Sequence, residues 1–262
     1  MTSHDPPEDA GRSPRLYTDL AWVWPFVSPP EDYPEEVETF RARFVRHGVP
    51  DGAPVLHLGC GGGSIDWHLK RHYAVTGVDL SVGMLDHARG LNPEVEYSQG
   101  DIRDIRLNRT FAAVLLHDAV AYMTTPTDLR AAYATAAAHL APGGVLVTLP
   151  EELRSRFAQH HVQSETHTRG DRSVTTVLVD FDPDPSDTSS ETTFVFLIRE
   201  AGRPLQVETD THVVGLYELD EVLGALREVG FDPLAERWET VSDLEPDEDD
   251  YTLITAIKLP TA

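Results

Sequence analysis

Apolar and polar positions follow a recurring pattern through the middle of the chain. Between residues 50 and 150, short apolar runs end in polar or glycine-rich turns, and each turn leads into apolar residues at helical spacing. The expected strands are 55–58, 74–78, 95–97, 111–116 and 145–149, and the expected helices are 64–71, 81–90 and 127–140. Strands joined by helices of this length form a parallel sheet with right-handed crossovers. The pattern therefore predicts an α/β fold.

Local signals set the ends of these helices. Ser81 and Thr127 are predicted N-caps, because short hydroxyl side chains accept hydrogen bonds from the N–H groups at a helix start. The run Pro142, Gly143 and Gly144 is expected to end the alanine-rich helix before the fifth strand.

From about residue 154 the pattern changes to β-branched residues in partial alternation, which predicts an inserted antiparallel unit over 154–216. Its expected strands are 173–181, 191–199 and 205–217. A helix over 218–229 and strands over 234–241 and 251–259 then return to the first pattern. The expected core is therefore 49–153 together with 217–262, and the insertion forms a β cap.

The N-terminal part precedes this core. Residues 1–14 contain three prolines and no apolar periodicity, so a disordered tail is expected. Residues 15–48 predict a helical lid that ends at Gly48. Its aromatic residues either cover a ligand pocket or pack on the core, and the sequence leaves both open. These residues are Tyr17, Trp22, Trp24 and Tyr33.

Composition and charge narrow the functions. The chain has 44 acidic and 21 basic side chains, a formal net charge of -23, which disfavours nucleic acid and anionic membranes as partners. High-salt adaptation and a GC-rich genome both explain this excess. No apolar stretch approaches the roughly 20 residues of a membrane span, and the polar N-terminus predicts a cytoplasmic protein. The single Cys60 excludes an internal disulfide and a cysteine-based zinc cluster.

The most informative motif lies at the end of the first strand. Residues 55–63 read as a strand that ends in glycines, and a helix follows. Glycines permit a tight turn and close approach of a ligand, while the helix start offers N–H groups. Asp79, at the end of the next strand, is placed to accept hydrogen bonds from ribose hydroxyls. The pair of features indicates an adenosine-containing ligand.

The glycine motif and three later motifs resemble the class I S-adenosylmethionine-dependent methyltransferases. The matching stretches are 56–63, 78–81 with Met84, 99–102 and 139–144. The insertion is loosely similar to the small-molecule branch, which includes sugar and glycine N-methyltransferases. The resemblance implies a Rossmann-like fold: a mostly parallel seven-stranded sheet with an antiparallel β insertion and an N-terminal helical lid over the acceptor pocket.

The same resemblance implies a cofactor site for S-adenosyl-L-methionine, with S-adenosyl-L-homocysteine as product. The residues implied are Gly59, Gly61, Gly63, Asp79, Leu80, Met84, Asp101, Ile102 and His117. Asp79 would bind the ribose hydroxyls, and Leu80 and Met84 would pack on the adenine. Asp101 would accept from the adenine amino group, with Ile102 beside the ring. His57 departs from the family, which usually has an acidic residue there. We interpret His57 as a hydrogen-bonded core histidine.

The predicted catalytic residues are His117, at the carboxyl end of the fourth strand, and Tyr17 in the lid. A histidine there can remove a proton near neutral pH, or it can order the loop or contact the cofactor. No metal site is predicted, because His160, His161 and His167 lack regular spacing. Cys60 is expected to be a small side chain in the turn.

The sequence thus favours methyl transfer to an amine or hydroxyl of a small molecule. Two alternatives remain at this stage: an NAD(P)-dependent oxidoreductase, against which the glycine spacing speaks, and a non-catalytic cofactor-binding or interaction protein. A homodimer through the inserted β cap is a further prediction.

Overall fold

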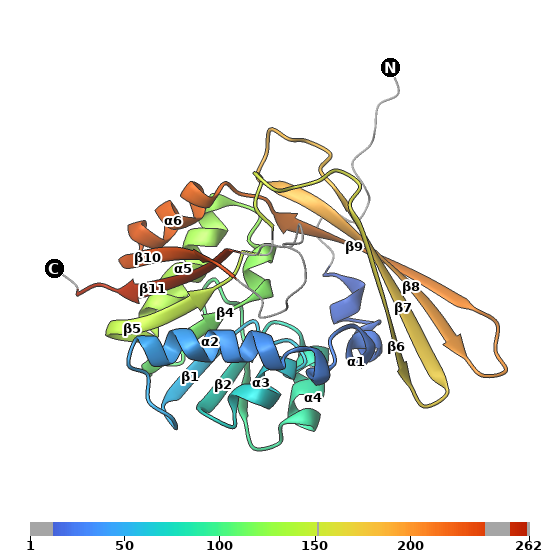
Figure 1. The fold of residues 1–262 in the computed structure, drawn as a ribbon, viewed down its shortest axis with the longest axis horizontal. Coiled ribbons are helices and arrows are strands. Elements are labelled where there is room, and N and C mark those ends of the chain that lie inside the picture. The colour runs from blue at the N-terminus through green and yellow to red at the C-terminus, as the bar shows by residue number, and fades with distance from the viewer. Residues whose placement is uncertain (1–12, 151, 239–251, 261–262) are drawn as a thin grey trace.

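A computed structural model describes residues 13–150, 152–238 and 252–260, and it contains two sheets (Figure 1). The larger has the order β10-β11-β5-β4-β1-β2-β3. Its strands are β1 (Pro54–Leu58), β2 (Ala74–Asp79), β3 (Glu96–Gln99), β4 (Phe111–Leu116), β5 (Leu140–Thr148), β10 (Phe231–Arg237) and β11 (Thr252–Lys258). Six of these strands run in one direction, and β11 runs in the opposite direction between β10 and β5. The predicted mostly parallel seven-stranded sheet is confirmed.

Helices cover both faces of this sheet (Figure 1). They are α2 (Pro34–Arg46), α3 (Ser64–Leu69), α4 (Val82–Leu91), α5 (Pro126–Ala138) and α6 (Leu219–Glu228). Successive side chains of a strand point to opposite faces. In β4, Ala113 and Leu115 accordingly pack in the core with α2 and α3, while Val114 and Leu116 pack in the core with α5 and α6.

Two predicted helix boundaries were wrong. Thr125, not Thr127, caps α5: its side chain accepts from the Asp128 N–H, and Pro126 occupies the first helical position, where its missing N–H costs nothing. The Pro142–Gly144 run does not end α5, which stops at Ala138. It lies within β5, where the pairing with β4 is irregular.

The second sheet is the inserted cap. It has four antiparallel strands in chain order: β6 (Val162–Arg169), β7 (Arg172–Phe181), β8 (Ser189–Glu200) and β9 (Gln206–Gly215). The first of these was missed, because its side chains are almost all exposed and polar and so show no apolar alternation. The acidic run after β7 forms a turn, in which Asp182 and Asp184 accept hydrogen bonds from backbone N–H groups two residues on.

The N-terminal segment lies between the core and the cap (Figure 1). It contains η1 (Arg15–Tyr17), η2 (Ala21–Val23), α1 (Trp24–Val27) and η3 (Pro30–Asp32). Its apolar side chains pack on the inner face of the cap. This cluster comprises Leu16, Leu20, Val23, Phe26, Val174, Phe196 and Ile198.

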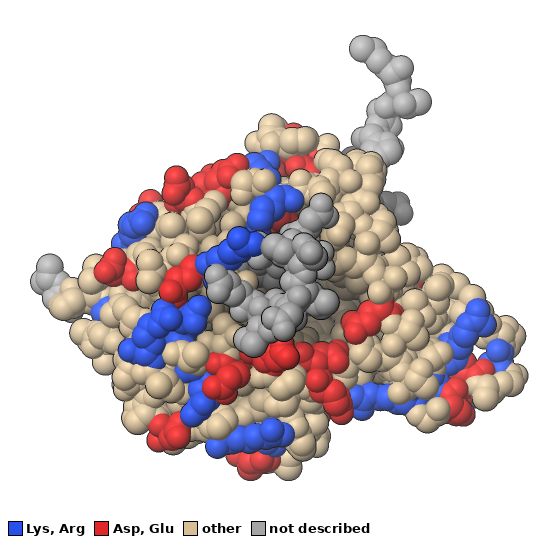
Figure 2. Space-filling model, in the orientation of Figure 1, with Lys and Arg blue, Asp and Glu red and all other residues tan. Residues whose placement is uncertain are grey.

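Three predicted elements fall partly outside the described residues: the tail over 1–14 and the strands over 234–241 and 251–259. Within the described ranges, no helix is long and apolar enough to cross a membrane. Figure 2 shows acidic and basic side chains interspersed over the core on the face drawn, while the middle of the cap is largely uncharged.

Candidate cofactor and acceptor site

A large cavity lies where the carboxyl ends of the parallel strands meet the N-terminal segment and the cap. Its volume is about 1140 Å³, larger than most pockets for one small ligand. Residues from all three units line it, including Asp79 from the core, Tyr17 from the N-terminal segment and His212 from the cap. The cavity is therefore large enough to hold two ligands side by side.

The glycine turn forms one wall. Gly59 has φ +76°, and a Cβ there would lie 2.0 Å from the Cβ of Ala119 in η4 (Asp118–Tyr122). Gly61 has φ +51°, and a Cβ there would lie 3.1 Å from the ring of Trp24. Glycine is required at the first position by close approach and at both by the left-handed backbone. Gly63 does not line the cavity; it packs against Asn92 and Tyr97.

Asp79 points into the same end of the cavity. Its two carboxylate oxygens accept from the backbone N–H groups of Gly61 and Ser81, each at 2.8 Å. Burial raises the pKa of Asp79, against the effect of these hydrogen bonds. Each oxygen retains a second lone pair, so the carboxylate can also accept from the hydroxyls of a ribose.

Apolar side chains that could pack against a flat ring line the cavity close to Asp79 in the sequence. Leu80 is 59% exposed and Val82 is 51% exposed although both are apolar, and buried Ile102 also lines the cavity. Met84, predicted to pack on the adenine, is buried elsewhere and does not line the cavity. It lies on the inward face of α4, whereas Val82 of the same helix lines the cavity.

Asp101 lines the cavity but is held by Arg103. The guanidinium contacts both carboxylate oxygens, with the shortest distance 2.6 Å, and lowers the pKa of Asp101. The side chain predicted to accept from an adenine amino group is thus fixed in its charged form.

His57 is buried and lines the cavity as well. Its Nδ1 lies 2.7 Å from Asp66 Oδ1, and the hydroxyl of Tyr97 donates to the other oxygen of Asp66. This places His57 in a buried hydrogen-bonded network, as interpreted from the sequence. Cys60 beside it is also buried, and burial raises the pKa of its thiol, which disfavours a nucleophilic role.

His117 is almost fully buried between two carboxylates. Its Nε2 lies 2.7 Å from Glu36 Oε1 of α2, and its Nδ1 lies 2.8 Å from Asp118 Oδ1. Burial opposes its charge, but Asp118 and Glu36 outweigh burial and raise the pKa of His117 well above its ordinary value. A histidine with both nitrogens protonated has no lone pair to act as a base. The geometry favours the alternative role, that of ordering the loop.

No signal in the sequence indicated a row of hydrogen-bonded side chains that also lines the cavity. The hydroxyls of Tyr17 and Tyr122 lie 2.6 Å apart, and Tyr122 lies 2.7 Å from Nδ1 of His212. Nε2 of His212 lies 2.8 Å from Asp210, which also accepts from the backbone N–H of Leu16. Tyr17 and Tyr122 are 105 positions apart and Tyr122 and His212 are 90 apart, so no local signal joins them.

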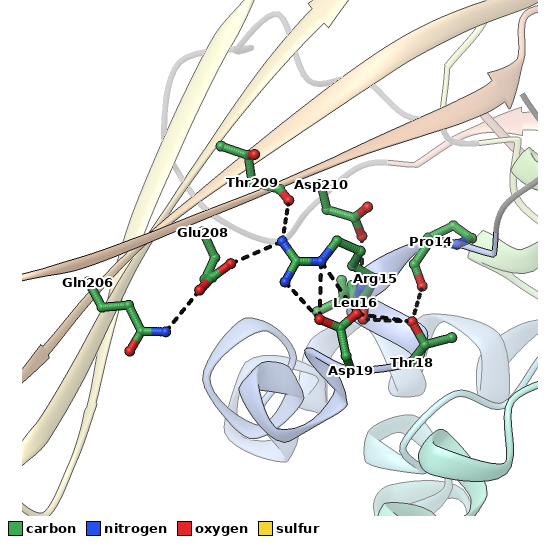
Figure 3. Close-up of polar contacts among 9 residues, drawn as sticks. All are labelled: Pro14, Arg15, Leu16, Thr18, Asp19, Gln206, Glu208, Thr209 and Asp210. Carbon is green, nitrogen blue, oxygen red and sulfur yellow. Dashed lines mark hydrogen bonds and ion pairs between the residues drawn. The ribbon is translucent and has the colours of Figure 1, made fainter. Parts of the chain in front are cut away.

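The N-terminal segment is fastened on both sides. Toward the cap, Arg15 contacts Glu208 and the Thr209 carbonyl of β9, and Asp210 lies next to it (Figure 3). Within the segment, Arg15 also contacts Asp19. Toward the core, Ser81 Oγ donates to the Tyr17 carbonyl at 2.6 Å. Tyr17 is therefore held between the Asp79 region and the cap.

Two arginines, Arg103 and Arg156, also line the cavity, as does His161. Within the described residues, Nε of Arg156 is buried and has no hydrogen-bond partner. Nearby Arg154 is instead committed to the carbonyls of Pro185, Asp187 and Leu216.

The three histidines considered for a metal site are not brought together. His160 stacks on Phe181, His161 lies 3.6 Å from Asp180, and His167 contacts Asp32 and Glu165 on the surface.

The chain is similar to known methyltransferases. The family described as "Methyltransferase domain" matches residues 55–144. The dTDP-3-amino-3,4,6-trideoxy-alpha-D-glucopyranose N,N-dimethyltransferase of Streptomyces venezuelae is 33% identical over 202 residues, which are 76% of this chain and 84% of the relative. These similarities confirm the resemblance drawn from the motifs.

Solved structures agree. The crystal structure of Streptomyces venezuelae DesVI has a TM-score of 0.74 and 27% identity, covering 92% of this chain and 96% of that one. S-adenosylmethionine-bound CalS10, an amino pentose methyltransferase from Micromonospora echinaspora, has a TM-score of 0.72 and 25% identity, with coverage of 85% and 90%. The predicted class I methyltransferase fold is confirmed.

Proposed function

We propose that this chain, which belongs to the class I S-adenosylmethionine-dependent methyltransferases, methylates an amino group of a nucleotide-linked deoxy sugar. The observation that carries this proposal is one large cavity lined both by the glycine turn with Asp79 and by the paired phenols of Tyr17 and Tyr122. The first group of residues, here called the cofactor end, suits a nucleoside, and the second suits a sugar amine.

At the cofactor end, the chain's own residues fit S-adenosylmethionine. Asp79 would accept from the ribose hydroxyls, exposed Leu80 would pack on the adenine, and the Gly59–Gly61 turn, which lines the same cavity, would border the remainder. The cofactor supplies a methyl group on a sulfonium, which needs neither a metal nor a covalent enzyme intermediate. The protein contributes proximity, alignment and exclusion of water.

An amine acceptor fits the second group of residues better than a hydroxyl does. A hydroxyl, which holds its proton far more tightly than an ammonium does, needs a strong base as it attacks, and the ion pairs of His117 make that residue a poor one. A neutral amine attacks without one, provided that it is oriented. Tyr17 and Tyr122 provide hydroxyl groups for that orientation.

The nucleotide part of the acceptor carries negative charge, which the acidic chain as a whole disfavours. Arg156, with its partnerless Nε in the described structure, and His161 offer a local site for a diphosphate. Local contacts decide binding here, because surface charges beyond about 10 Å are screened by salt.

The test is methyl transfer to a panel of dTDP-linked amino sugars, with the matching hydroxy sugars as controls. We expect product only with the amino sugars, detected by mass spectrometry as added methyl groups. Turnover of the hydroxy sugars at an equal rate, or of neither set, would refute the proposal.

We also propose that the chain forms a homodimer through the outer face of the cap. On β9, Val207 and Val213 are 53% and 49% exposed, and on β8 Val195 and Leu197 point away from the buried side. An apolar face of this kind commonly marks an interface.

Light scattering should therefore give twice the monomer mass. The double variant Val195→Glu with Leu197→Glu should shift the protein to monomer, because four like charges would meet across the two-fold contact. A matched variant at the exposed Val45 of α2 should leave the mass unchanged. A monomeric wild type at micromolar concentration would contradict the proposal.

A further inference from the structure

We propose that Tyr17, Tyr122, His212 and Asp210 form a proton relay that removes the proton from the acceptor nitrogen after each methyl transfer. The inference rests on the proposed amine methylation and deepens it. Its basis is the unbroken chain of contacts at 2.6, 2.7 and 2.8 Å from the cavity wall to a buried carboxylate in the cap.

The direction of the hydrogen bonds follows from Asp210. Burial alone would raise its pKa, but hydrogen bonds from His212 and from the backbone N–H of Leu16 outweigh burial and lower the pKa. An ionised carboxylate only accepts, so His212 must donate from Nε2.

In a neutral imidazole the other nitrogen is then an acceptor. Tyr122 therefore donates its hydroxyl hydrogen to Nδ1 of His212, and Tyr17 donates to the oxygen of Tyr122. The hydroxyl hydrogen of Tyr17 thus points to Tyr122. The hydroxyl oxygen of Tyr17, at the cavity wall, is the atom of the relay that accepts the proton from the substrate nitrogen.

The chemistry requires such an acceptor. When an amine attacks the methyl group, nitrogen forms a bond to carbon, the carbon–sulfur electron pair goes to sulfur, and the product is an alkylammonium. The nitrogen has no lone pair for a second methylation until an N–H bond breaks. One proton then passes to Tyr17 as Tyr17 gives its own to Tyr122 and Tyr122 gives its own to His212.

The surroundings suit His212 as the terminal residue. It is 1% exposed, and its ring lies 4.4 Å from that of Phe194, centroid to centroid, so water does not compete for its nitrogens. The titratable side chains in contact with it are Asp210 on β9, Tyr122 in η4 and, through its ring, Tyr17 in η1. Asp210 stabilises the imidazolium, which loses its proton when water enters the emptied cavity.

The first experiment reads the tautomer of His212 and needs no acceptor. Protein with ¹⁵N-labelled histidine and bound S-adenosylhomocysteine is studied by long-range ¹H–¹⁵N NMR, and the signal is assigned with His212→Asn. We expect hydrogen on Nε2 and a lone pair on Nδ1. Hydrogen on Nδ1, or on both nitrogens throughout the pH range of turnover, would overturn the relay.

The second experiment measures turnover against pH for wild type, Tyr122→Phe and His212→Asn, with dTDP-3-amino-3,4,6-trideoxy-α-D-glucose as acceptor. Asparagine can accept from Tyr122 but cannot take the proton. Both variants should turn over about 10²-fold more slowly at pH 7, the low end for general base catalysis. They should approach wild type as pH rises and the amine loses its proton in solution, and they should accumulate monomethylated product.

Thr211→Val is the matched control, since it removes an exposed hydroxyl beside His212 on the opposite face of β9. It should match wild type in rate, and all variants should bind S-adenosylhomocysteine as wild type does. A reduction that stays constant with pH would overturn the relay. If wild type methylates no amino sugar, the proposed function fails, and the NMR result still decides the direction of the hydrogen bonds.

Discussion

Replacing His117 with phenylalanine should lower the free energy of unfolding by about 3 kcal/mol at pH 6, although histidine and phenylalanine have similar ring sizes. The histidine bridges Glu36 and Asp118 inside the protein, and its loss leaves the mostly buried Glu36 without its cation. Breaking a buried ion pair costs about 3–5 kcal/mol, and the 17% exposure of the Glu36 side chain favours the lower value.

The loss should depend on pH in a defined direction. The pKa of His117 is raised in the folded protein, so its stabilisation is complete below the unfolded value of about 6.5. It is lost as pH rises through the higher folded pKa. The difference in stability between wild type and variant, measured by urea unfolding, should therefore shrink from pH 6.5 upward.

The control is the double variant with Glu36→Gln, which removes the stranded charge and should recover part of the lost stability. A difference that does not change between pH 6 and pH 10 would contradict the ion-pair role. A further variant, His117→Gln, addresses catalysis. If His117 were the base, His117→Gln would lose about 10²–10⁴-fold in turnover and recover at high pH. We expect neither effect at temperatures where the variant is folded.

The parallel core was predictable because its signals are local. The strand over 111–116 was predicted with its observed bounds, because six consecutive apolar residues lie between polar turns that mark both ends. The Ser81 cap and Asp79 at the end of β2 were also readable from the sequence. In each case residues within a few positions of one another decide the structure.

The cap and the hydrogen-bonded side chains of Tyr17, Tyr122 and His212 depend instead on contacts between residues far apart in the sequence. β6 was missed because a polar edge strand gains its order from pairing with β7, not from its own pattern. His117 was read as a base because its partner Glu36 lies 81 positions away, on a helix whose docking the sequence does not specify. Tyr17 was chosen as catalytic, but its link to His212 exists only once β9 folds against η1 and η4.

Gly61→Val should weaken binding of S-adenosylhomocysteine by about 10²–10³-fold, equivalent to about 3–4 kcal/mol. Gly61 gives its N–H to Asp79 and lies under the Trp24 ring. A Cβ there would meet that ring at 3.1 Å, and the two methyl groups of valine would have to displace Trp24 or enter the cavity. Both movements take space from the ligand beside Asp79.

Backbone strain alone does not explain such a loss, and the chain offers a control for it. Gly143 also has a left-handed backbone, φ +83°, but has no atom within 4 Å of an added Cβ. Gly143→Val carries the same type of strain, of order 1–3 kcal/mol, far from the cavity. Calorimetry should show wild-type affinity for Gly143→Val and a near-complete loss for Gly61→Val, with similar decreases in melting temperature. Equal affinities in the two variants would mean that the glycine turn does not hold the cofactor, because the strain is shared and only the position differs.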